Sequence, residues 1–465
     1  MIRTLVIPNI TWGGSSKKNL LQDSYIEFLY KFMLGMKSVR EDIFWYILLP
    51  LYNGKHSIQT LETKKRLSFP NTHFIEIEIP RQPLNRIHFN VQELHRKIKT
   101  REYAIDLVFN HQPELNNQYK IFFEQMKNFN PPTIGYSHFF EFENVGWKGS
   151  FTSGITGILD MEICYLNTEH QKQLVLEEIK KTFNKDVYQK IDEKLKVFPP
   201  MIVPNNIRTS KDGTYEKTIV WNHRTDRTKS FMGFQMAIFE LRKQRQDFKV
   251  WIPLLEKSHP LSKVDYVLVG LNETKRKYLE TLRKCCVGVN GEQTYGGWSI
   301  ATTDGNMCGV PYIQYDADYY RELNEGSDFY KDKDELIQLL NEYLDKPSYR
   351  NQMAKQTIEN LILKVNLEKK IKSVSRKIDA TINKVRIKNT PKSKELIKII
   401  KKEKTIEQSK LFSTNYGNVG GQLKFDGYRK KILSDKKITE VSLSDKTGIR
   451  GGKRYEWKSI YRYGK

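Results

Sequence analysis

The sequence lacks an uninterrupted run of about 18 apolar residues, which is the length that a membrane-spanning helix needs. Its first residues, MIRTLVIPNITWGG, are too short and too interrupted an apolar stretch for a signal peptide. Only 4 of the 465 residues are cysteines, and the 9 histidines are scattered without the spacing of a zinc site. These absences exclude a membrane-spanning or disulfide-stapled protein and predict a cytoplasmic one, in the host cytoplasm if the chain is viral.

Acidic residues are scarce relative to basic ones. The chain has 54 Asp and Glu against 78 Lys and Arg, which gives a net charge of +24. Residues 384–465 hold 23 Lys and Arg but 8 Asp and Glu, so the last sixth of the chain carries +15 of this excess. A basic excess of this size favours an anionic partner, and nucleic acid, anionic lipid and acidic polymers all remain open.

Apolar runs alternate with amphipathic segments in the first half of the chain. We expect strands at residues 4–10, 44–49, 74–79, 106–110, 133–136, 163–166 and 197–203, and helices at residues 18–36, 84–99 and 169–183. Alternation of this kind predicts a parallel, doubly wound α/β domain over residues 1–204. The polar segment at residues 205–217 is expected to be the linker to the next domain.

The same alternation continues over residues 218–365, which predicts a second doubly wound domain. Strands are expected at residues 218–221, 248–252, 266–269, 287–289 and 311–314, and helices at residues 231–243, 274–283 and 298–306. Residues 334–360 are expected to form two amphipathic helices, separated by the Asp-Lys-Pro run at residues 345–347. The composition then changes. Residues 366–465 are expected to be a basic extension that begins with a lysine-rich helix over residues 369–404 and continues with glycines and aromatics.

A glycine-rich loop runs into a predicted helix near the centre of the second domain. The stretch GEQTYGGWSIATTDGNMCGVPYI covers residues 291–313, and its glycines permit tight backbone turns. The helix at its centre is expected to begin near Ser299, so the amides of Trp298, Ser299 and Ile300 would be free to bind a diphosphate. Carboxylates repel phosphate, and we therefore expect Glu292 and Asp304 to hold sugar or ribose hydroxyl groups.

Two cations bracket the first strand-to-helix turn of the second domain. Arg224 and Lys229 lie between the strand at residues 218–221 and the helix at residues 231–243. A diphosphate at this turn would meet both cations and the positive end of the helix dipole. We expect Asn222, at the end of the same strand, to contact the ligand as well.

These motifs resemble a known family. The run DGNMCGVP, residues 304–311, resembles the donor-site motif of retaining GT-B glycosyltransferases of the glycosyltransferase-4-like superfamily, with Asp304 in place of the family's second Glu. The first Glu of that motif would stand at Gly296, and the nearest acid is Glu292. The Arg-to-Lys spacing at residues 224–229 is similar to that of the family's diphosphate-binding pair. The run WNHR, residues 221–224, is similar to the start of the C-terminal domain in glycosyltransferases that decorate a modified base in transfer RNA.

The resemblance covers about residues 5–365. It implies a GT-B fold, in which two Rossmann-like domains face a cleft, together with a nucleoside-diphosphate sugar as co-substrate and retention of anomeric configuration. Protein cations and helix amides would stabilise the leaving diphosphate, so no metal is expected to be required. We interpret the Asp-Ala-Asp run at residues 316–318 as a solvated turn.

Several predicted strand ends of the first domain would face such a cleft, because ligands of open α/β sheets bind beyond the carboxyl ends of the strands. Gly13 and Gly14 follow the first strand and are expected near the donor. His111 and His138 follow two later strands. Retaining transfer needs no conventional protein base, and if one acts, His138 or His111 is the candidate.

The basic extension predicts the acceptor. Basic residues interleaved with aromatics bind phosphates and stack on bases, and we expect this role for Lys453, Arg454, Tyr455, Trp457 and Arg462. Charge and analogy together favour sugar transfer to DNA that carries hydroxymethylated pyrimidines, as in phage DNA glycosyltransferases. Two alternatives stay open: a glycosyltransferase for an envelope lipid or polysaccharide at an anionic membrane surface, and a non-catalytic nucleic-acid-binding protein on a GT-B scaffold.

Overall fold

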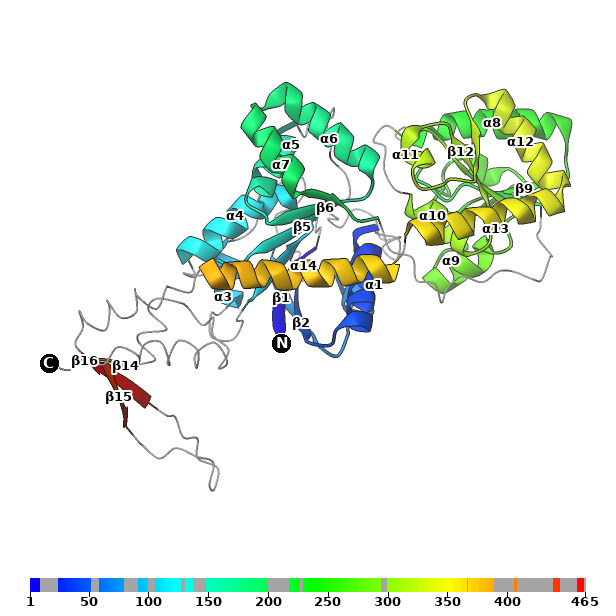
Figure 1. Cartoon of the computed structure of the whole chain (residues 1–465). Helices are drawn as coiled ribbons and strands as arrows, with labels where there is room; N and C mark the ends of the chain where they lie inside the picture. Colours follow the sequence, from blue (N-terminus) through cyan, green and yellow to red (C-terminus); the bar gives the residue numbers. More distant parts are fainter. Residues whose placement is uncertain are drawn as a thin grey trace, which may run out of the picture.

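The computed structural model describes residues 1–8, 24–51, 58–78, 91–98, 105–126, 130–137, 140, 148–199, 217–225, 229–293, 299–365, 367–388, 405–407, 438–443 and 458–463. These residues form two α/β domains, a long helix that returns from the second domain to the first, and a small antiparallel sheet (Figure 1). Within these ranges, no helix is long and apolar enough to cross a membrane.

The first domain is built on a seven-stranded sheet in the order β3-β2-β1-β4-β5-β6-β7, in which all neighbouring strands pair in parallel. Neighbouring residues on a strand enter different cores: Val6 and Phe109 lie in one, and Leu5 and Val108 in the other. The near-continuous apolar runs of the sequence are therefore what a sheet covered on both faces requires. Its strands are β1 (Ile2–Ile7), β2 (Ile43–Leu51), β3 (Thr72–Glu78), β4 (Leu107–Asn110), β5 (Thr133–Ser137), β6 (Ile163–Leu166) and β7 (Leu195–Val197).

Helices connect these strands and cover the sheet. They are α1 (Ser24–Val39), α2 (Ile58–Arg66), α3 (Val91–Lys97), α4 (Asn116–Ile121), α5 (Lys148–Leu159), α6 (Glu169–Thr182) and α7 (Lys185–Lys194), with a 3₁₀ turn at Pro113–Leu115 and a π-helical turn at Phe122–Met126. The strand expected over residues 197–203 overlaps β7 at Val197, where β7 ends, and residues 200–203 lie outside the described residues. The linker expected over residues 205–217 lies outside the described residues except for Lys217.

The second domain repeats the plan with a six-stranded parallel sheet in the order β10-β9-β8-β11-β12-β13. Its strands are β8 (Thr218–Val220), β9 (Lys249–Ile252), β10 (Val267–Val269), β11 (Val287–Asn290), β12 (Tyr312–Tyr315) and β13 (Asp328–Tyr330). Its helices are α8 (Phe231–Gln244), α9 (Lys275–Leu282), α10 (Ile300–Met307), α11 (Asp318–Arg321), α12 (Lys333–Asp345) and α13 (Pro347–Lys364), with a 3₁₀ turn at Pro260–Lys263. The prediction of two doubly wound domains is confirmed.

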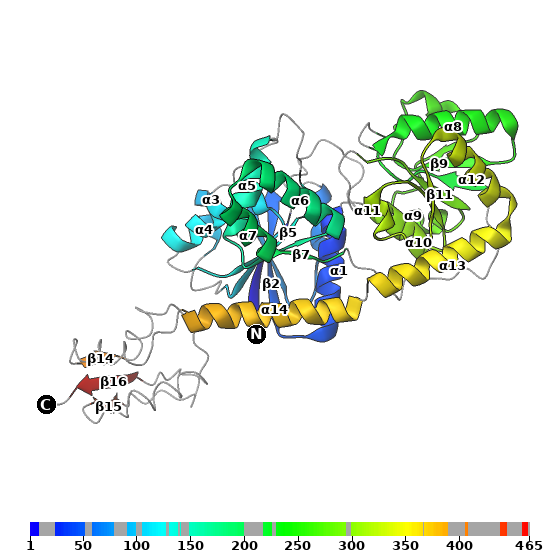
Figure 2. The same cartoon turned by 45° about the horizontal axis from the view of Figure 1, so that its top comes forward.

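Helix α14 (Leu367–Lys388) does not belong to a separate extension. It follows α13 and runs back along the first domain (Figures 1 and 2). Its apolar stripe of Ile371, Val374, Ile378 and Ile382 is buried in the same core as α1. The boundary expected at residue 366 is therefore wrong, because these side chains complete the first domain. Beyond α14, the described strands β14 (Thr405–Glu407), β16 (Lys458–Tyr463) and β15 (Ile438–Leu443) form an antiparallel sheet in that order.

The two domains meet at the carboxyl ends of their strands. Glu322, which follows α11, accepts hydrogen bonds from the backbone amides of Glu169 and His170 at 2.7 and 2.8 Å. These amides open α6, and Thr168 caps the same helix by accepting from the amide of Gln171. A carboxylate of one domain thus completes the cap of a helix in the other, where the helix dipole favours a negative charge.

The packing of α14 predicts a large effect of a small truncation. Ile371 is 1% exposed in the core of the first domain. We expect Ile371→Ala to lower the free energy of unfolding by about 2–5 kcal/mol, because it removes buried methylene groups and leaves a cavity. Lys377→Ala, on the exposed side of the same helix, should change it by less than about 0.5 kcal/mol. Urea unfolding measures both variants, and equal effects would contradict the assignment of α14 to this core.

Candidate functional site

The second sheet has its topological switch point between β8 and β11, because the strand order runs outward from this pair in both directions. In doubly wound sheets the ligand crevice lies beyond the carboxyl ends of the strands at this point. His223 follows β8 there, and Asn290 is the last residue of β11. The structure thus places the turn after β8 and the loop after β11 side by side, as the two sequence motifs require.

Buried hydrogen bonds tie this edge together. The side-chain nitrogen of Asn290 donates to Thr302 on α10 and to Gln314 on β12, and its side-chain oxygen faces Nε2 of His223. Because the amide nitrogen is committed to two acceptors, the oxygen must accept from His223, so the neutral ring carries its proton on Nε2. The hydroxyl of Tyr330 on β13 donates to the backbone carbonyl of Asn290 at 3.1 Å. Thr302, Gln314 and Tyr330 were not identified from the sequence, because amides and hydroxyls carry no pattern.

His223 is held in its neutral form. Burial lowers its pKa to about 3, and the nearby positive charge of Lys229 acts in the same direction. The hydrogen bond that His223 donates to Asn290 opposes this shift only in part. The ring is 7% exposed and contacts Trp221 edge-on. His223 therefore supports the cationic turn without adding a third charge to it.

The cationic turn lies directly against the β11–α10 loop. The side chain of Arg224 is exposed, and its carbonyl accepts from the indole of Trp221 at 3.3 Å. Lys229 is half-buried and donates to the side-chain oxygen of Gln293. A Cβ at Gly291 would lie 2.5 Å from the carbonyl oxygen of Lys229, so only glycine permits this approach. The structure therefore brings Lys229, in the same turn as Arg224, to the predicted phosphate loop. Residues 226–228 and 294–298, including Trp298, lie outside the described residues.

Helix α10 begins as the sequence predicts. Ser299 is its N-cap and accepts from the amide of Thr302 at 3.2 Å. Asn222 is buried beneath this start: it donates to the carbonyl of Ala301 at 3.0 Å and accepts from Tyr312 at 3.0 Å. We expected Asn222 to contact a ligand, and in the structure these bonds turn its amide inward, toward α10 and β12.

Asp304 lies in the middle of α10 and forms a buried ion pair. Its Oδ2 accepts from the ammonium of Lys275 on α9 at 2.5 Å. Burial lowers the pKa of Lys275, but Asp304 and then Glu27 outweigh this effect and raise it. Glu27 is on α1 of the first domain, and its own pKa is lowered by Lys31, Lys275 and Arg66 against the effect of burial. The charge of Asp304 is thus coupled to the other domain. Glu292, by contrast, is exposed.

The candidate base in the first domain is enclosed. His111 follows β4, is 2% exposed, and packs its ring against Phe28, Phe109 and Tyr136. His111 is therefore packed within the interior of the first domain. We had expected it to be a base that is open to an acceptor. Gly13, Gly14 and His138 lie outside the described residues.

Two further expectations concern anionic and metal ligands. Lys453, Arg454, Tyr455 and Trp457 lie outside the described residues, whereas Arg462 is in β16, opposite Thr405 and Thr439 of the neighbouring strands. In the part of the chain that the structure describes, no group of three or more His, Cys, Asp or Glu side chains gathers to hold a metal ion. Asp316 of the Asp-Ala-Asp run accepts from Arg321 at 2.6 Å.

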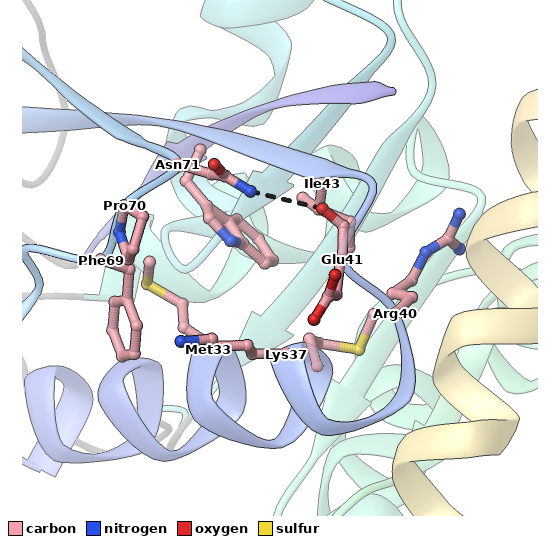
Figure 3. Close-up of a pocket in the computed structure, with 10 residues that line it drawn as sticks. Met33, Lys37, Arg40, Glu41, Ile43, Phe69, Pro70 and Asn71 are labelled. Atoms are coloured by element: carbon pink, nitrogen blue, oxygen red, sulfur yellow. Dashed lines mark hydrogen bonds between the residues drawn. The ribbon is translucent and has the colours of Figure 1, made fainter.

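A pocket of about 270 Å³ lies at the opposite edge of the first sheet (Figure 3). It is formed by the end of α1 and the beginnings of β2 and β3. Arg40 is directed from its rim toward α14, where it pairs with Asp379 at 3.0 Å. This is the amino edge of the strands, so the pocket is separate from the switch-point site. Its lining residues are Met33, Met36, Lys37, Arg40, Glu41, Ile43, Trp45, Phe69, Pro70 and Asn71.

Comparison with known proteins identifies the architecture. No family model and no curated protein matches the sequence. Among solved structures, HepE of Anabaena in complex with UDP-glucose is 12% identical, with a TM-score of 0.56 over 81% of this chain and 100% of that one. Trehalose-6-phosphate synthase OtsA is 9% identical, with a TM-score of 0.56 over 82% of this chain and 99% of that one. TarM is 12% identical, with a TM-score of 0.57 over 82% of this chain and 98% of that one. At these identities the likeness shows the fold, and the predicted GT-B fold is confirmed.

The enclosed His223 predicts a dependence of stability on pH. Its pKa is about 3 in the folded chain and about 6.5 in the unfolded chain. The neutral ring therefore favours folding above about pH 6.5, and this contribution is lost as the pH falls toward 3. We expect His223→Gln to flatten the fall in unfolding free energy between about pH 6.5 and 4, as measured by urea unfolding of the second domain. The exposed Gln244→Ala, which removes no titratable group, should keep the wild-type slope, and equal slopes in all three proteins would contradict this account.

Proposed function

We propose that this protein is a glycosyltransferase that moves a sugar from a nucleoside-diphosphate sugar to an acceptor hydroxyl, with retention of configuration. The observation that carries the proposal is the contact of Lys229, in the turn after β8 that also holds Arg224, with Gln293 in the loop after β11, at the switch point of a GT-B fold. A second support is that HepE, which shares this fold, was solved in complex with UDP-glucose.

The site matches the charge that develops during such a transfer. The bond between the anomeric carbon and the phosphate oxygen breaks, and its electron pair leaves with the diphosphate. The acceptor oxygen forms the new bond to the anomeric carbon. With retention, the acceptor enters on the face that the diphosphate leaves, so the leaving phosphate oxygen takes up the acceptor proton. Arg224, Lys229 and the amides at Ser299 and Ile300 stabilise the diphosphate, so this site requires no metal.

The carboxylates have separate roles in this proposal. Asp304 keeps one oxygen on Lys275, which holds the carboxylate in place, and turns the other to a ribose or sugar hydroxyl. Glu292 is exposed at the start of the loop and contacts the sugar. In this proposal both carboxylates add specificity for hydroxyl groups.

Removal of either cation of the turn should slow transfer without unfolding the chain. We expect Arg224→Ala and Lys229→Ala each to cost about 2–4 kcal/mol in the transition state, or roughly 10²–10³ in rate, because each loses a charge-assisted contact to the leaving group. Lys249→Ala removes an exposed lysine at the amino edge of the same sheet and should leave the rate unchanged. Initial rates with a saturating acceptor test this expectation. Unchanged turnover in both Arg224→Ala and Lys229→Ala would contradict the donor-site assignment.

We propose nucleic acid as the acceptor, with DNA that carries hydroxymethylated pyrimidines as the favoured form. The support is the charge of +15 on residues 384–465. Most of this charge lies in residues 389–465, which follow α14. The apolar stripe of α14 is buried in the core of the first domain. We therefore assign the binding of phosphates to residues 389–465. Mass spectrometry of nucleosides from cells that express the protein identifies the modified base and its sugar.

Truncation after Lys388 should remove most of the affinity for DNA while it keeps the core of the first domain. If about 6–10 phosphates are neutralised, the affinity of the full chain should fall roughly 10³–10⁵-fold between about 50 and 200 mM salt. Titration of labelled duplex DNA at several salt concentrations measures this in both proteins, and equal affinity for UDP shows that both are folded. If truncation leaves the DNA affinity unchanged, the DNA-binding surface lies in the cleft between the two domains. Binding to phosphatidylglycerol vesicles but not to DNA would replace the nucleic-acid acceptor by an envelope acceptor.

A further inference from the structure

A buried glutamine stands beside the cationic turn and was not identified from the sequence. Gln293 follows β11, is 6% exposed, and accepts from the ammonium of Lys229 through its side-chain oxygen. Its side-chain nitrogen donates to the hydroxyl of Tyr320 on α11. Its backbone amide donates to the hydroxyl of Tyr319 at 2.9 Å. The side chain of Gln293 is thus anchored at the backbone and at its far end.

The partners of Tyr320 determine which way this amide points. A phenol has one proton, and Tyr320 donates it to the carbonyl of Gly291 at 3.0 Å. It must therefore accept from Gln293, so the nitrogen of the amide faces Tyr320 and the oxygen faces Lys229. Tyr320 is 1% exposed, and burial raises its pKa well above the usual value, so it remains a donor. The orientation of the amide follows from this chain of bonds.

A neutral acceptor at this place preserves the positive charge of the turn. A carbonyl oxygen orients an ammonium but leaves its full charge available to an anion, whereas a carboxylate would cancel it and repel a diphosphate. An ammonium has three N–H groups, so it can keep one bond to Gln293 while it turns others to phosphate oxygens. The contact therefore suits a lysine that must be held in place and remain charged.

We propose that Gln293 is a positioning residue that aims Lys229 at the leaving diphosphate and that must be neutral to do so. This inference rests on the proposed function, because it assumes that a diphosphate binds at the turn. Gln293 acts through Lys229 and does not itself take part in the chemistry. Tyr320 and Gly291 complete the support by holding its amide in one orientation.

The test uses Gln293→Glu, which keeps the shape of the side chain and adds a charge that protonation removes. The titratable and charged groups around this position include Lys229 and Arg224 on the turn, Tyr319 and Tyr320 on α11, Glu292 in the loop, and His223 after β8. His170 of the first domain lies against the ring of Tyr319. The pKa of Tyr319 is about 12 and that of His223 about 3, so neither titrates near neutral pH. These groups are also present in the wild type, so their own titration cancels in the ratio of the UDP dissociation constants of the variant and the wild type.

We expect the dissociation constant of Gln293→Glu for UDP to exceed that of the wild type by about 10- to 100-fold at pH 8, the scale on which outer partners of a charged site act. The ratio should shrink as the pH is lowered to 5.5, by up to about tenfold per pH unit, because UDP binds the variant with its carboxyl protonated. Isothermal titration calorimetry should detect the matching proton uptake. A loss of packing alone would weaken binding to the same degree at every pH, and a pH-independent ratio would overturn the proposal.

Two further variants complete the experiment. Gln293→Met removes the acceptor without adding charge, so it should weaken UDP binding about tenfold or more with no dependence of the ratio on pH. Gln244→Glu adds the same charge at the exposed far end of α8 and should bind UDP as the wild type does. If Gln293→Glu does not fold, wild-type affinity in Gln293→Met overturns the proposal and weakened affinity supports it.

Nucleotide binding by the wild type distinguishes a failure of this inference from a failure of the proposed function. It is titrated with UDP and then with GDP, ADP and CDP, and the series is run with the nucleotide that binds most tightly. Failure to bind any of them overturns the proposed function, and this inference falls with it. Tight binding by the wild type together with wild-type affinity in both variants at position 293 overturns the inference alone.

Discussion

The side-chain amide of Asn290 is the contact on which the binding edge of the second domain depends. It joins α10 through Thr302, β12 through Gln314 and the turn after β8 through His223. All of these groups are buried, and an unsatisfied buried polar group costs about 1–3 kcal/mol. The network can therefore neither open to water nor exchange partners at small cost. It sets the cationic turn and the start of α10 in one arrangement before any ligand binds, which is what stabilisation of a leaving group requires.

Charges around this edge are arranged so that the turn keeps its positive charge. Lys275 is neutralised by Asp304, while Lys229 meets the uncharged oxygen of Gln293. His223 is kept neutral by burial. The positive charge of the turn is thus concentrated on Arg224 and Lys229. The same logic links the domains, because Glu322 of the second domain caps α6 of the first with a carboxylate at the positive end of a helix.

Agreement between sequence and structure is closest where burial determines the pattern. The strands β2, β6 and β9 were located within one or two residues, because strands covered on both faces are nearly continuous apolar runs. Helix α5 was not predicted, since KGSFTSGITGIL is rich in glycine and threonine. Gly157 within it lies against the carbonyl of Pro113, where a Cβ would come within 1.9 Å. Close packing against another segment therefore selected the residue, and no local propensity reveals that.

The sequence by itself determined the α/β class, the two doubly wound domains and the two motifs that meet at the switch point. Those features depend on the period of apolar residues and on glycines and charges at turns, which are local properties of the chain. Only the tertiary structure decided that α14 completes the first domain, that Asn222 faces inward, and that Gln293 meets Lys229. These are contacts between segments far apart in the chain, and an amide has the same side chain whether its partner is a helix end, an ammonium or water.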